Sequence, residues 1–443
     1  MPKIIAEVNC AIHDSFRVRQ LMGMFDLPMR HETSERFEVE LPGANEEWSI
    51  GLIVGPSGSG KTTVARRAFG DNLYQSKDWP ADRAIIDCFG ERTVKEITHV
   101  LSSVGFSSPP AWLRPYAMLS NGEKFRCDLA NALLGEGVGG RELAVGTERP
   151  SACLPATPNL LPPAPNICVF DEFTSVVDRT VARIGSAAVS KAIRSNRINR
   201  RFVAVSCHYD IAEWLEPDWV LDMASGKLAR GRLRRPAIQL EIVRTDRSAW
   251  KIFERHHYLS ADLNPAAACF VGMIDGRAAV FCGVLPFPHP TRPGWREHRT
   301  VCLPDFQGLG IGHALAEFVA SLFAATGKPY TGTTSHPAMI RHRARSALWR
   351  MIRAPSRAGI PPMRGLAHTS SHARLTAAFR YVGPTRSSEA KEFGVRGVRR
   401  SAAREGGRTG PARPGSERRG PGSEGEAEAR REAAAAIRAA GGA

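Results

Sequence analysis

A glycine-rich stretch at residues 55–63, Gly-Pro-Ser-Gly-Ser-Gly-Lys-Thr-Thr, constrains the fold of this chain more than any other feature. It fits the pattern GxxxxGK[ST] and stands between an apolar run at residues 49–54 and a helix-forming run. Glycines let backbone N–H groups converge on a phosphate, and the helix N-terminus adds its positive dipole end. We therefore expect a strand–loop–helix unit whose lysine reaches the β- and γ-phosphates of a nucleotide. Its predicted binding residues are Gly55, Pro56, Ser57, Gly58, Ser59, Gly60, Lys61, Thr62 and Thr63.

Two later apolar runs end in residues suited to phosphate hydrolysis. Residues 167–170 read as a buried strand, and Asp171 and Glu172 follow at once. Asp171 can hold Mg²⁺ through water, and Glu172 can polarise the attacking water. A second strand-like run, residues 202–207, ends at His208. Two acids that merely cap a strand end are the structural alternative, but the polar residues that surround them argue against it.

A serine–glycine stretch completes the pattern of the first half of the chain. Residues 119–123 read Leu-Ser-Asn-Gly-Glu and lie between the glycine loop and the strand at 167–170. This order of elements resembles the ABC-type ATPase family, whose signature is LSGGQ, over roughly residues 1–235. The resemblance implies that Ser120 and Gly122 contact the ATP of a second protomer, so that ATP closes a head-to-tail homodimer.

The same resemblance assigns the polar residues after the two strands. Asp171 corresponds to the Mg²⁺-binding acid of the family's Walker B strand, and Glu172 to the catalytic acid beside it. Asp178 closes a D-loop, and His208 matches the switch histidine that contacts the γ-phosphate. We therefore expect ATP and Mg²⁺ as cofactors, Glu172 and His208 as catalytic residues, and Thr62 and Asp171 as metal ligands.

The spacing of these motifs predicts an insertion. Ser120 and Asp171 are 51 residues apart, whereas the family usually has about 20 between the signature and the Walker B strand. Residues 135–165 are rich in Gly and Pro and show no periodicity, and subtracting these 31 residues leaves 20. In addition, no glutamine occurs between Gln75 and Gln239, so the family's Q-loop glutamine is missing. This departure argues against a transporter motor.

A second glycine loop follows about 250 residues after the first. Residues 304–315 read Pro-Asp-Phe-Gln-Gly-Leu-Gly-Ile-Gly-His-Ala-Leu, between a strand-like run at 299–303 and an amphipathic run. As a dinucleotide fingerprint it fails, because His313 stands where GxGxxG needs its last glycine. As Gln307-x-x-Gly310-x-Gly312 it fits a strand-to-helix turn whose backbone donors face a pyrophosphate.

This arrangement resembles motif A of the GNAT acetyltransferase family, over about residues 237–385. The resemblance implies that acetyl-CoA is the cofactor. Its pyrophosphate would lie on the backbone of Gln307, Gly308, Leu309, Gly310, Ile311 and Gly312. The family offers no universal base to carry over. The candidate acid and base groups are Glu254, His256, His257, Tyr258, Glu297, His298, Tyr330, Ser335 and His336.

The charge of the chain suits a polyanionic partner. The formal net charge is +16, and no acidic residue occurs from Phe318 to Ser388. A nucleic-acid surface is one interpretation of the arginines in that stretch, and a CoA 3′-phosphate site on a basic solvated surface is the other. The arginines are at 341, 343, 345, 350, 353, 357, 364, 374, 380 and 386.

Taken together, the sequence predicts an α/β ABC-type ATPase domain at residues 1–235 and a GNAT-like α+β domain at 237–385. Residues 386–443 are predicted to form a disordered basic tail. No run of 18 uncharged apolar residues and no signal sequence are found, so we expect a soluble, cytoplasmic protein without membrane insertion. Two alternatives stay open: the ATPase subunit of a transporter, and an ATP-gated DNA-binding clamp whose GNAT-like domain is not catalytic. The acceptor of the acyl group is left undetermined.

Overall fold

The computed structural model describes residues 3–11, 13–25, 32–43, 46–135, 166–258, 262–289, 291–357 and 375–397. The predicted insertion beyond Gly135, the predicted tail beyond Gly397, and Arg364 and Arg374 lie outside these described residues. Contacts divide the chain into two compact units. Unit 1 comprises Met1–Arg83, Asp87–Arg92 and Pro115–Pro236, and unit 2 comprises Ala84–Ile86, Thr93–Arg114 and Ala237–Ala443. Residues 84–86 and 93–114, which the motif order places within the ATPase domain, thus group with unit 2.

Unit 1 is built on a five-stranded sheet with the order β4-β5-β3-β6-β7. Its strands are β3 (Ile50–Val54), β4 (Ile167–Phe170), β5 (Arg201–Ser206), β6 (Trp219–Asp222) and β7 (Lys227–Arg230). The first four strands in the sheet run parallel, and β7 pairs antiparallel with β6. Because parallel strands end at the same edge of a sheet, the residues that follow β3, β4, β5 and β6 emerge along one border.

Unit 1 also contains helices and a separate pair of strands. The helices are α1 (Phe16–Phe25), α2 (Lys61–Phe69), α5 (Asn121–Leu134), α6 (Arg179–Arg194) and α7 (Ala212–Leu215). Strands β1 (Lys3–Ala11) and β2 (Glu32–Glu40) pair antiparallel as a separate two-stranded sheet. All residues of β3 are buried. The apolar run that the sequence shows at 49–54 is therefore a central strand covered on both faces.

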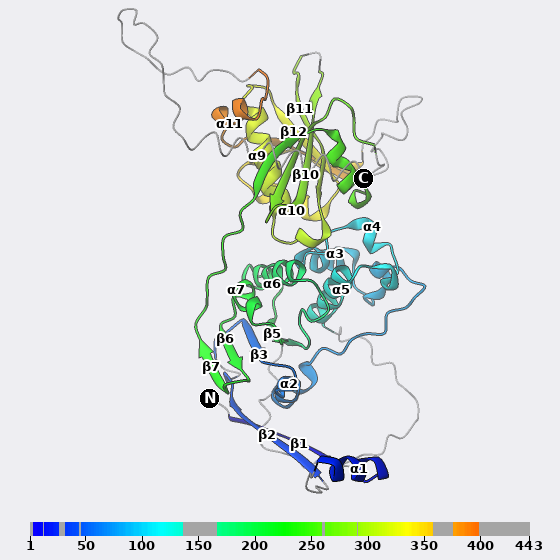
Figure 1. Ribbon diagram of the computed structural model, residues 1–443. Coiled ribbons are helices and arrows are strands. Elements are labelled where there is room, and N and C mark those ends of the chain that lie inside the picture. The colour runs from blue at the N-terminus through cyan, green and yellow to red at the C-terminus, as the bar shows by residue number, and fades with distance from the viewer. Residues whose placement is uncertain are drawn as a thin grey trace, which may run out of the picture. The chain divides into compact units, whose positions relative to one another are not determined.

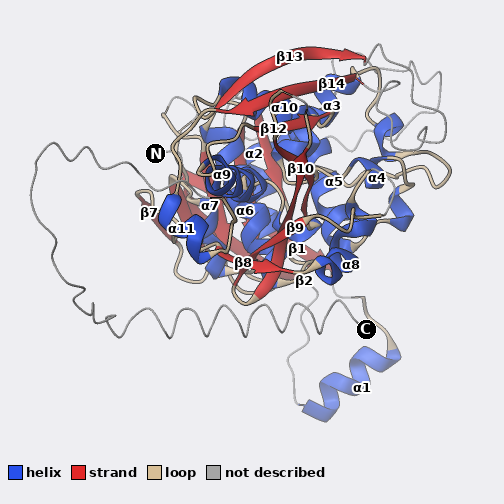
Figure 2. Ribbon diagram, turned by 90° about the horizontal axis from the view of Figure 1, so that it is seen from above, coloured by secondary structure: helices blue, strands red, loops and turns tan. Residues whose placement is uncertain are grey.

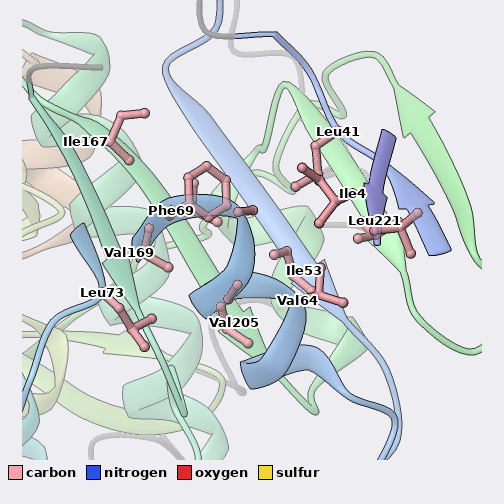
Figure 3. Close-up of a cluster of buried hydrophobic side chains, with 14 of the residues drawn as sticks. Ile4, Leu41, Ile53, Val64, Phe69, Leu73, Ile167, Val169, Val205 and Leu221 are labelled. Atoms are coloured by element: carbon pink, nitrogen blue, oxygen red, sulfur yellow. The ribbon is translucent and has the colours of Figure 1, made fainter. Parts of the chain in front are cut away.

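A single apolar cluster fixes α2 to this sheet, as Figure 3 shows. Ile53 of β3 and Val64 of α2 are both fully buried, and β1 and β2 contribute Ile4 and Val39 to the same cluster. A buried side chain of this size stabilises the fold by about 1.5–3 kcal/mol. The cluster therefore holds the start of α2 in a fixed place relative to the end of β3.

Unit 2 contains a seven-stranded sheet with the order β13-β14-β12-β11-β10-β9-β8. Its strands are β8 (Glu241–Thr245), β9 (Ala268–Ile274), β10 (Arg277–Phe287), β11 (Gly294–Cys302), β12 (Tyr330–Thr334), β13 (Trp349–Arg357) and β14 (Leu375–Tyr381). Neighbouring strands pair antiparallel except β11 and β12, which are parallel. A parallel pair needs a crossover, and α9 (Ile311–Ala324) is that crossover. Figure 1 shows α9 beside this sheet.

The other helices of unit 2 are short. They are α3 (Val94–Ser103), α4 (Pro109–Trp112), α8 (Trp250–Phe253), α10 (Pro337–Arg345) and α11 (Ser387–Glu392). Packing continues past residue 386, where the tail is predicted to start, because Ala390 and Phe393 are buried and the Phe393 ring contacts Phe270 and Phe318. Within the described residues of both units, no helix has the length and apolar character needed to cross a membrane.

Candidate functional site

The first glycine loop of unit 1 joins β3 to α2. Gly58 and Gly60 both adopt φ 79°, in the left-handed region that suits glycine, and Gly60 is the N-cap of α2. The N–H groups of the first helical residues have no intrahelical acceptor. The loop therefore presents a turn of backbone donors at a helix N-terminus, which is the arrangement that binds a phosphate.

Three observations describe the interior of this loop. A Cβ atom on Gly60 would lie 2.5 Å from the Phe37 ring, so only glycine fits between that ring and the loop. The Ser59 hydroxyl is buried and has no hydrogen-bond partner among the described residues. The Lys61 ammonium, 9% exposed, donates to the Pro56 carbonyl oxygen at 2.7 Å. Lys61 is thus held inside the loop, where a bound phosphate would offer it a stronger, charged acceptor.

The parallel sheet brings the predicted hydrolytic residues to the same border as the glycine loop. Asp171 and Glu172 follow β4, and His208 lies just beyond β5, the strand between β4 and β3. Asp171 is half-buried and accepts a hydrogen bond from the Glu172 N–H at 2.9 Å. Glu172 is exposed and accepts from the Ser175 hydroxyl at 2.6 Å.

Within the described residues, no three His, Cys, Asp or Glu side chains form a metal-binding group. Mg²⁺ that accompanies a nucleotide takes most of its ligands from phosphate and water, which suits Thr62 and Asp171.

A strained turn ties the end of β4 to the end of β5. Glu172 and Thr174 have φ angles of 51° and 70°, which non-glycine residues seldom adopt. The fully buried Thr174 contacts the Nδ1 atom of His208 through its hydroxyl at 3.2 Å. The Ser206 hydroxyl donates to the Phe173 carbonyl oxygen and accepts from the His208 N–H. The turn therefore sets the positions of Glu172 and His208 together.

The charge state of His208 follows from its surroundings. Burial, and then the Arg179 guanidinium, lower the pKa of His208, while Glu172 acts in the opposite direction. A pKa below the ordinary 6.5 leaves the imidazole neutral at pH 7. In this form one ring nitrogen donates and the other accepts, so His208 can donate to a phosphate oxygen without adding a positive charge.

The signature stretch lies at the start of a different helix. Ser120 is the N-cap of α5, and its hydroxyl and the Glu123 carboxylate form a capping box with the two backbone N–H groups. Gly122 is buried, and a Cβ atom there would meet the Val181 side chain of α6 at 3.3 Å. Asp178 is the N-cap of α6 and accepts from the N–H groups of residues 180 and 181. The glutamate in place of the usual glutamine thus helps to cap α5.

The second glycine loop, in unit 2, repeats the turn seen in the first. Residues 304–306 form one 3₁₀ turn after β11, and Gly308 and Gly310 then adopt φ 95° and 90°. Gly310 is the N-cap of α9, with ψ 13°. A Cβ atom on Gly312 would meet nothing within 4 Å. Space is therefore open beside Gly312 in the first turn of α9, and a helix N-terminus is a place where a phosphate group can bind. The Gln307 side chain, however, is buried and bonded within unit 2, so only its backbone is left for the predicted role.

The parallel strands β11 and β12 diverge after a short contact. They pair only at Trp295 with Tyr330 and at Arg296 with Thr331. At the point of divergence, the register of β10 against β11 shifts so that His298 forms a bulge. Burial, and then the Arg299 guanidinium, lower the pKa of His298 to about 4.

A buried ion pair lies next to this divergence, and the sequence did not predict it. The Arg343 guanidinium of α10 donates to Glu297 at 2.6 Å, and their side chains are 1% and 7% exposed. Arg343 also lies 4.0 Å from the centre of the Trp349 ring. A Cβ atom on Gly332 would come within 2.5 Å of Arg343. Glu297 is therefore occupied by Arg343 and by the Thr300 hydroxyl at 2.8 Å. The prediction that Arg343 belongs to a basic surface is therefore wrong, because its guanidinium is buried and cannot reach a polyanion.

The known proteins that are similar to this chain fall into two groups. Residues 235–338 match the model of the acetyltransferase (GNAT) family. A search of curated proteins found no match. Among solved structures, an ATP-binding cassette dimer in a post-hydrolysis state with ADP and Pi is similar at TM-score 0.33 and 12% identity, over 52% of this chain and 99% of that one. A dimeric bacterial ABC transporter cassette has TM-score 0.30 and 13% identity, over 45% and 90%. The ribosomal-protein-S18-alanine N-acetyltransferase from Escherichia coli has TM-score 0.24 and 15% identity, over 32% and 93%. Residues 235–338 thus match the acetyltransferase (GNAT) family, and unit 1 is an α/β domain with a mostly parallel sheet and a glycine loop at the start of α2.

Proposed function

We propose that the protein hydrolyses ATP in unit 1 and transfers an acyl group from acetyl-CoA in unit 2. The observation that carries this proposal is the repeated turn at Gly60 and Gly310. In each case a glycine in the left-handed region is the N-cap of a helix that follows a strand. One such turn is a weak signal, but each occurs here inside a longer matching motif.

In the ATP half, each residue has a role that its position supports. Lys61 and the N-terminus of α2 hold the phosphates, and Thr62 and Asp171 hold Mg²⁺. Glu172 orients the water that attacks the γ-phosphorus atom, and the bond from that atom to ADP breaks as the new P–O bond forms. His208, neutral and fixed by Thr174, donates to the γ-phosphate. The turn at residues 172–174 stores strain that suits a residue placed for chemistry.

The variant Glu172→Gln tests this half. It removes the carboxylate that orients water but leaves Lys61, Thr62 and Asp171 in place. We expect ATP affinity within about threefold of wild type and hydrolysis reduced by at least 10²-fold. Glu213→Gln, an exposed glutamate on α7, is the matched control and should hydrolyse ATP normally. Unchanged turnover in Glu172→Gln would refute the assignment of the water-orienting acid.

In the acyl half, the backbone from Gln307 to Gly312 holds the pyrophosphate of acetyl-CoA. The nitrogen of an acceptor amine attacks the thioester carbonyl, the new C–N bond forms and the C–S bond breaks. The amine loses a proton, and the thiolate of CoA gains one. Gly310→Asp places a side chain and a negative charge at the N-cap, so calorimetry should show acetyl-CoA affinity reduced by at least tenfold and ATP affinity unchanged.

The control for this experiment is Gly276→Asp. Gly276 is also a left-handed glycine of unit 2, at φ 72°, but it lies in the turn between β9 and β10 with nothing within 4 Å. It reproduces the backbone strain without touching the loop. Absence of acetyl-CoA binding to the wild type would refute the acyltransferase and leave the ATP-gated clamp. Equal affinity in wild type and Gly310→Asp would show that the ligand binds elsewhere.

We further propose a head-to-tail homodimer and a nucleic-acid surface. The dimer is favoured because Ser120 caps α5, a helix separate from the glycine loop, so a second copy can bring its signature to the bound ATP. The surface is favoured by exposed arginines on α10 and on β13, with Arg343 excluded. The exposed ones are Arg345, Arg350 and Arg357.

A further inference from the structure

A segment from the first half of the sequence is part of unit 2. The residues Thr93–Arg114 lie between Lys61 and Ser120 along the chain, yet their contacts group them with the acetyltransferase domain. The segment is well formed. Thr93 and Glu96 make a capping box at the start of α3, and Phe106, Ser108 and Trp112 are buried.

The backbone of Ser107 is held by two side chains of unit 2. The Ser107 N–H donates to the Gln307 Oε1 atom at 2.6 Å, and the Nε2 atom of His336 lies 3.0 Å from the Ser107 carbonyl oxygen. Burial lowers the pKa of His336, so the neutral imidazole donates this second bond through Nε2–H. The Trp112 ring packs beside the His336 ring, with 6.3 Å between the two ring centroids. We refer to Gln307, His336 and the Ser107 peptide as the Ser107 clamp.

The clamp lies where the second glycine loop begins. Gln307 is the first residue of that loop, and its Nε2 group also donates to the carbonyl oxygen of Cys302, the last residue of β11. His336 is the N-cap of α10 and follows β12. Because β11 and β12 are parallel neighbours, Gln307 and His336 emerge at the same border of the sheet. The Ser107 peptide therefore bridges the chain that follows β11 to the chain that follows β12.

The same segment is joined closely to the ATPase signature. Only residues 115–119 separate Arg114 from Ser120. These residues include Pro115, whose φ is fixed, and a 3₁₀ turn at Tyr116–Met118. The Arg114 carbonyl oxygen also accepts from the Ile85 N–H at 3.0 Å. The connection between this segment and the N-terminus of α5 is therefore short and restricted in its conformation.

We propose that Thr93–Arg114 couples the nucleotide state of unit 1 to acetyl-CoA binding in unit 2 through the Ser107 clamp. The inference rests on the proposed function, since it needs both ligands. Gln307 and His336 are then positioning residues that set the glycine loop through the Ser107 peptide. By linkage, the factor by which nucleotide changes acetyl-CoA affinity must equal the factor by which acetyl-CoA changes nucleotide affinity.

Calorimetry on the full chain in the Glu172→Gln background, which holds ATP unhydrolysed, tests the coupling. The dissociation constant of acetyl-CoA is measured with and without saturating ATP, and that of ATP with and without saturating acetyl-CoA. We expect both ratios to differ from one by the same factor, at least about fivefold. If both ligands bind but both ratios equal one, the coupling is overturned and the proposed function stands. Absence of acetyl-CoA binding in both nucleotide states would instead overturn the proposed function.

Three variants assign the coupling to the clamp. Ser107→Pro removes the N–H that donates to Gln307, and His336→Phe keeps a ring against Trp112 but has no donor. Ser107→Ala is the matched control, because the clamp uses only the backbone of residue 107. We expect the ratio to fall to one in Ser107→Pro and His336→Phe and to stay at the wild-type value in Ser107→Ala. If Ser107→Pro does not fold, His336→Phe alone tests the role of the clamp. A wild-type ratio in His336→Phe would show that the clamp does not carry the coupling.

Discussion

Gly60→Ala is the substitution whose effect on unit 1 can be worked out most directly. Gly60 has φ 79° and ψ 13°, and an L-residue in that region costs about 1–2 kcal/mol. The added Cβ would lie 2.5 Å from the Phe37 ring, and overpacking of this kind costs a further 1–3 kcal/mol or so. Since Phe37 is only half-buried and has some room to turn, the lower half of that range applies. The expected loss of stability is about 2–4 kcal/mol.

Gly58→Ala is the control that isolates the contact with Phe37. Gly58 has the same φ of 79°, but a Cβ atom there would meet nothing within 4 Å. Only the backbone term of about 1–2 kcal/mol applies to it. The two alanine variants should therefore differ by about 1–2 kcal/mol, which corresponds to about 5- to 30-fold in an opening equilibrium.

Hydrogen exchange of the β3 amides, Ile50–Val54, in nucleotide-free protein measures this difference within unit 1. Protection should fall about 5- to 30-fold more in Gly60→Ala than in Gly58→Ala. Phe37→Leu in the Gly60→Ala background should recover most of the extra loss, as a double-mutant cycle would reveal. Equal loss of protection in the two single variants would refute the reasoning, because the Phe37 ring would then not lie against the loop.

Three other predictions concern assembly, charge and pH. Glu172→Gln should form a dimer in ATP that light scattering detects as a doubled mass, and a monomer throughout would contradict the head-to-tail model. Replacement of three exposed arginines by Glu should flatten the salt dependence of DNA binding by up to about three phosphates, at roughly 0.9 log units each. The test set is Arg345, Arg350 and Arg357, and the control set with the same charge change is Arg247, Arg255 and Arg292; equal slopes for the two sets would refute the surface. Because the pKa of His298 is lowered to about 4 from 6.5, its contribution to stability should be complete above pH 6.5 and lost as pH falls toward 4. Urea unfolding from pH 7 to 4 should show a weaker decline in His298→Asn, and identical profiles would contradict this role.

The sequence was most informative where function depends on local backbone. The glycine loops at 55–62 and 307–312 are strand–turn–helix units in which a few adjacent residues specify the geometry. The turn needs φ above zero at Gly58, Gly60, Gly308 and Gly310. The predicted strand–loop–helix units were confirmed, and residues 235–338 match the GNAT family model. Asp171 and His208 lie at one border because the strands before them are parallel. The order of the apolar runs predicts this only if the runs are assumed to form one parallel sheet.

Contacts between distant residues could not be predicted from the sequence. Glu297 and Arg343 are 46 positions apart, and the arginine looked like one of several solvated charges. Its burial follows from Gly332, which leaves room beside it, and from the Trp349 ring. Ser107 and Gln307 are 200 positions apart and belong to stretches with different motifs. A single sequence does not indicate which distant residues pair, because neither partner stands out from the residues next to it in the chain.

The outermost strand of unit 2 has a consequence for solubility. Strand β13 pairs with β14 on one side, as Figure 2 shows, and no described strand covers its other side. Such an open edge is a template for another β-strand, and Met351 and Ile352 are exposed along it. Pro355, the register shifts against β14 and the arginines of the strand oppose that pairing, because they remove a backbone donor, bend the edge and make two copies repel. A substitution that neutralises these arginines would thus expose a strand prone to edge-to-edge aggregation, whereas one that reverses their charge would keep the repulsion.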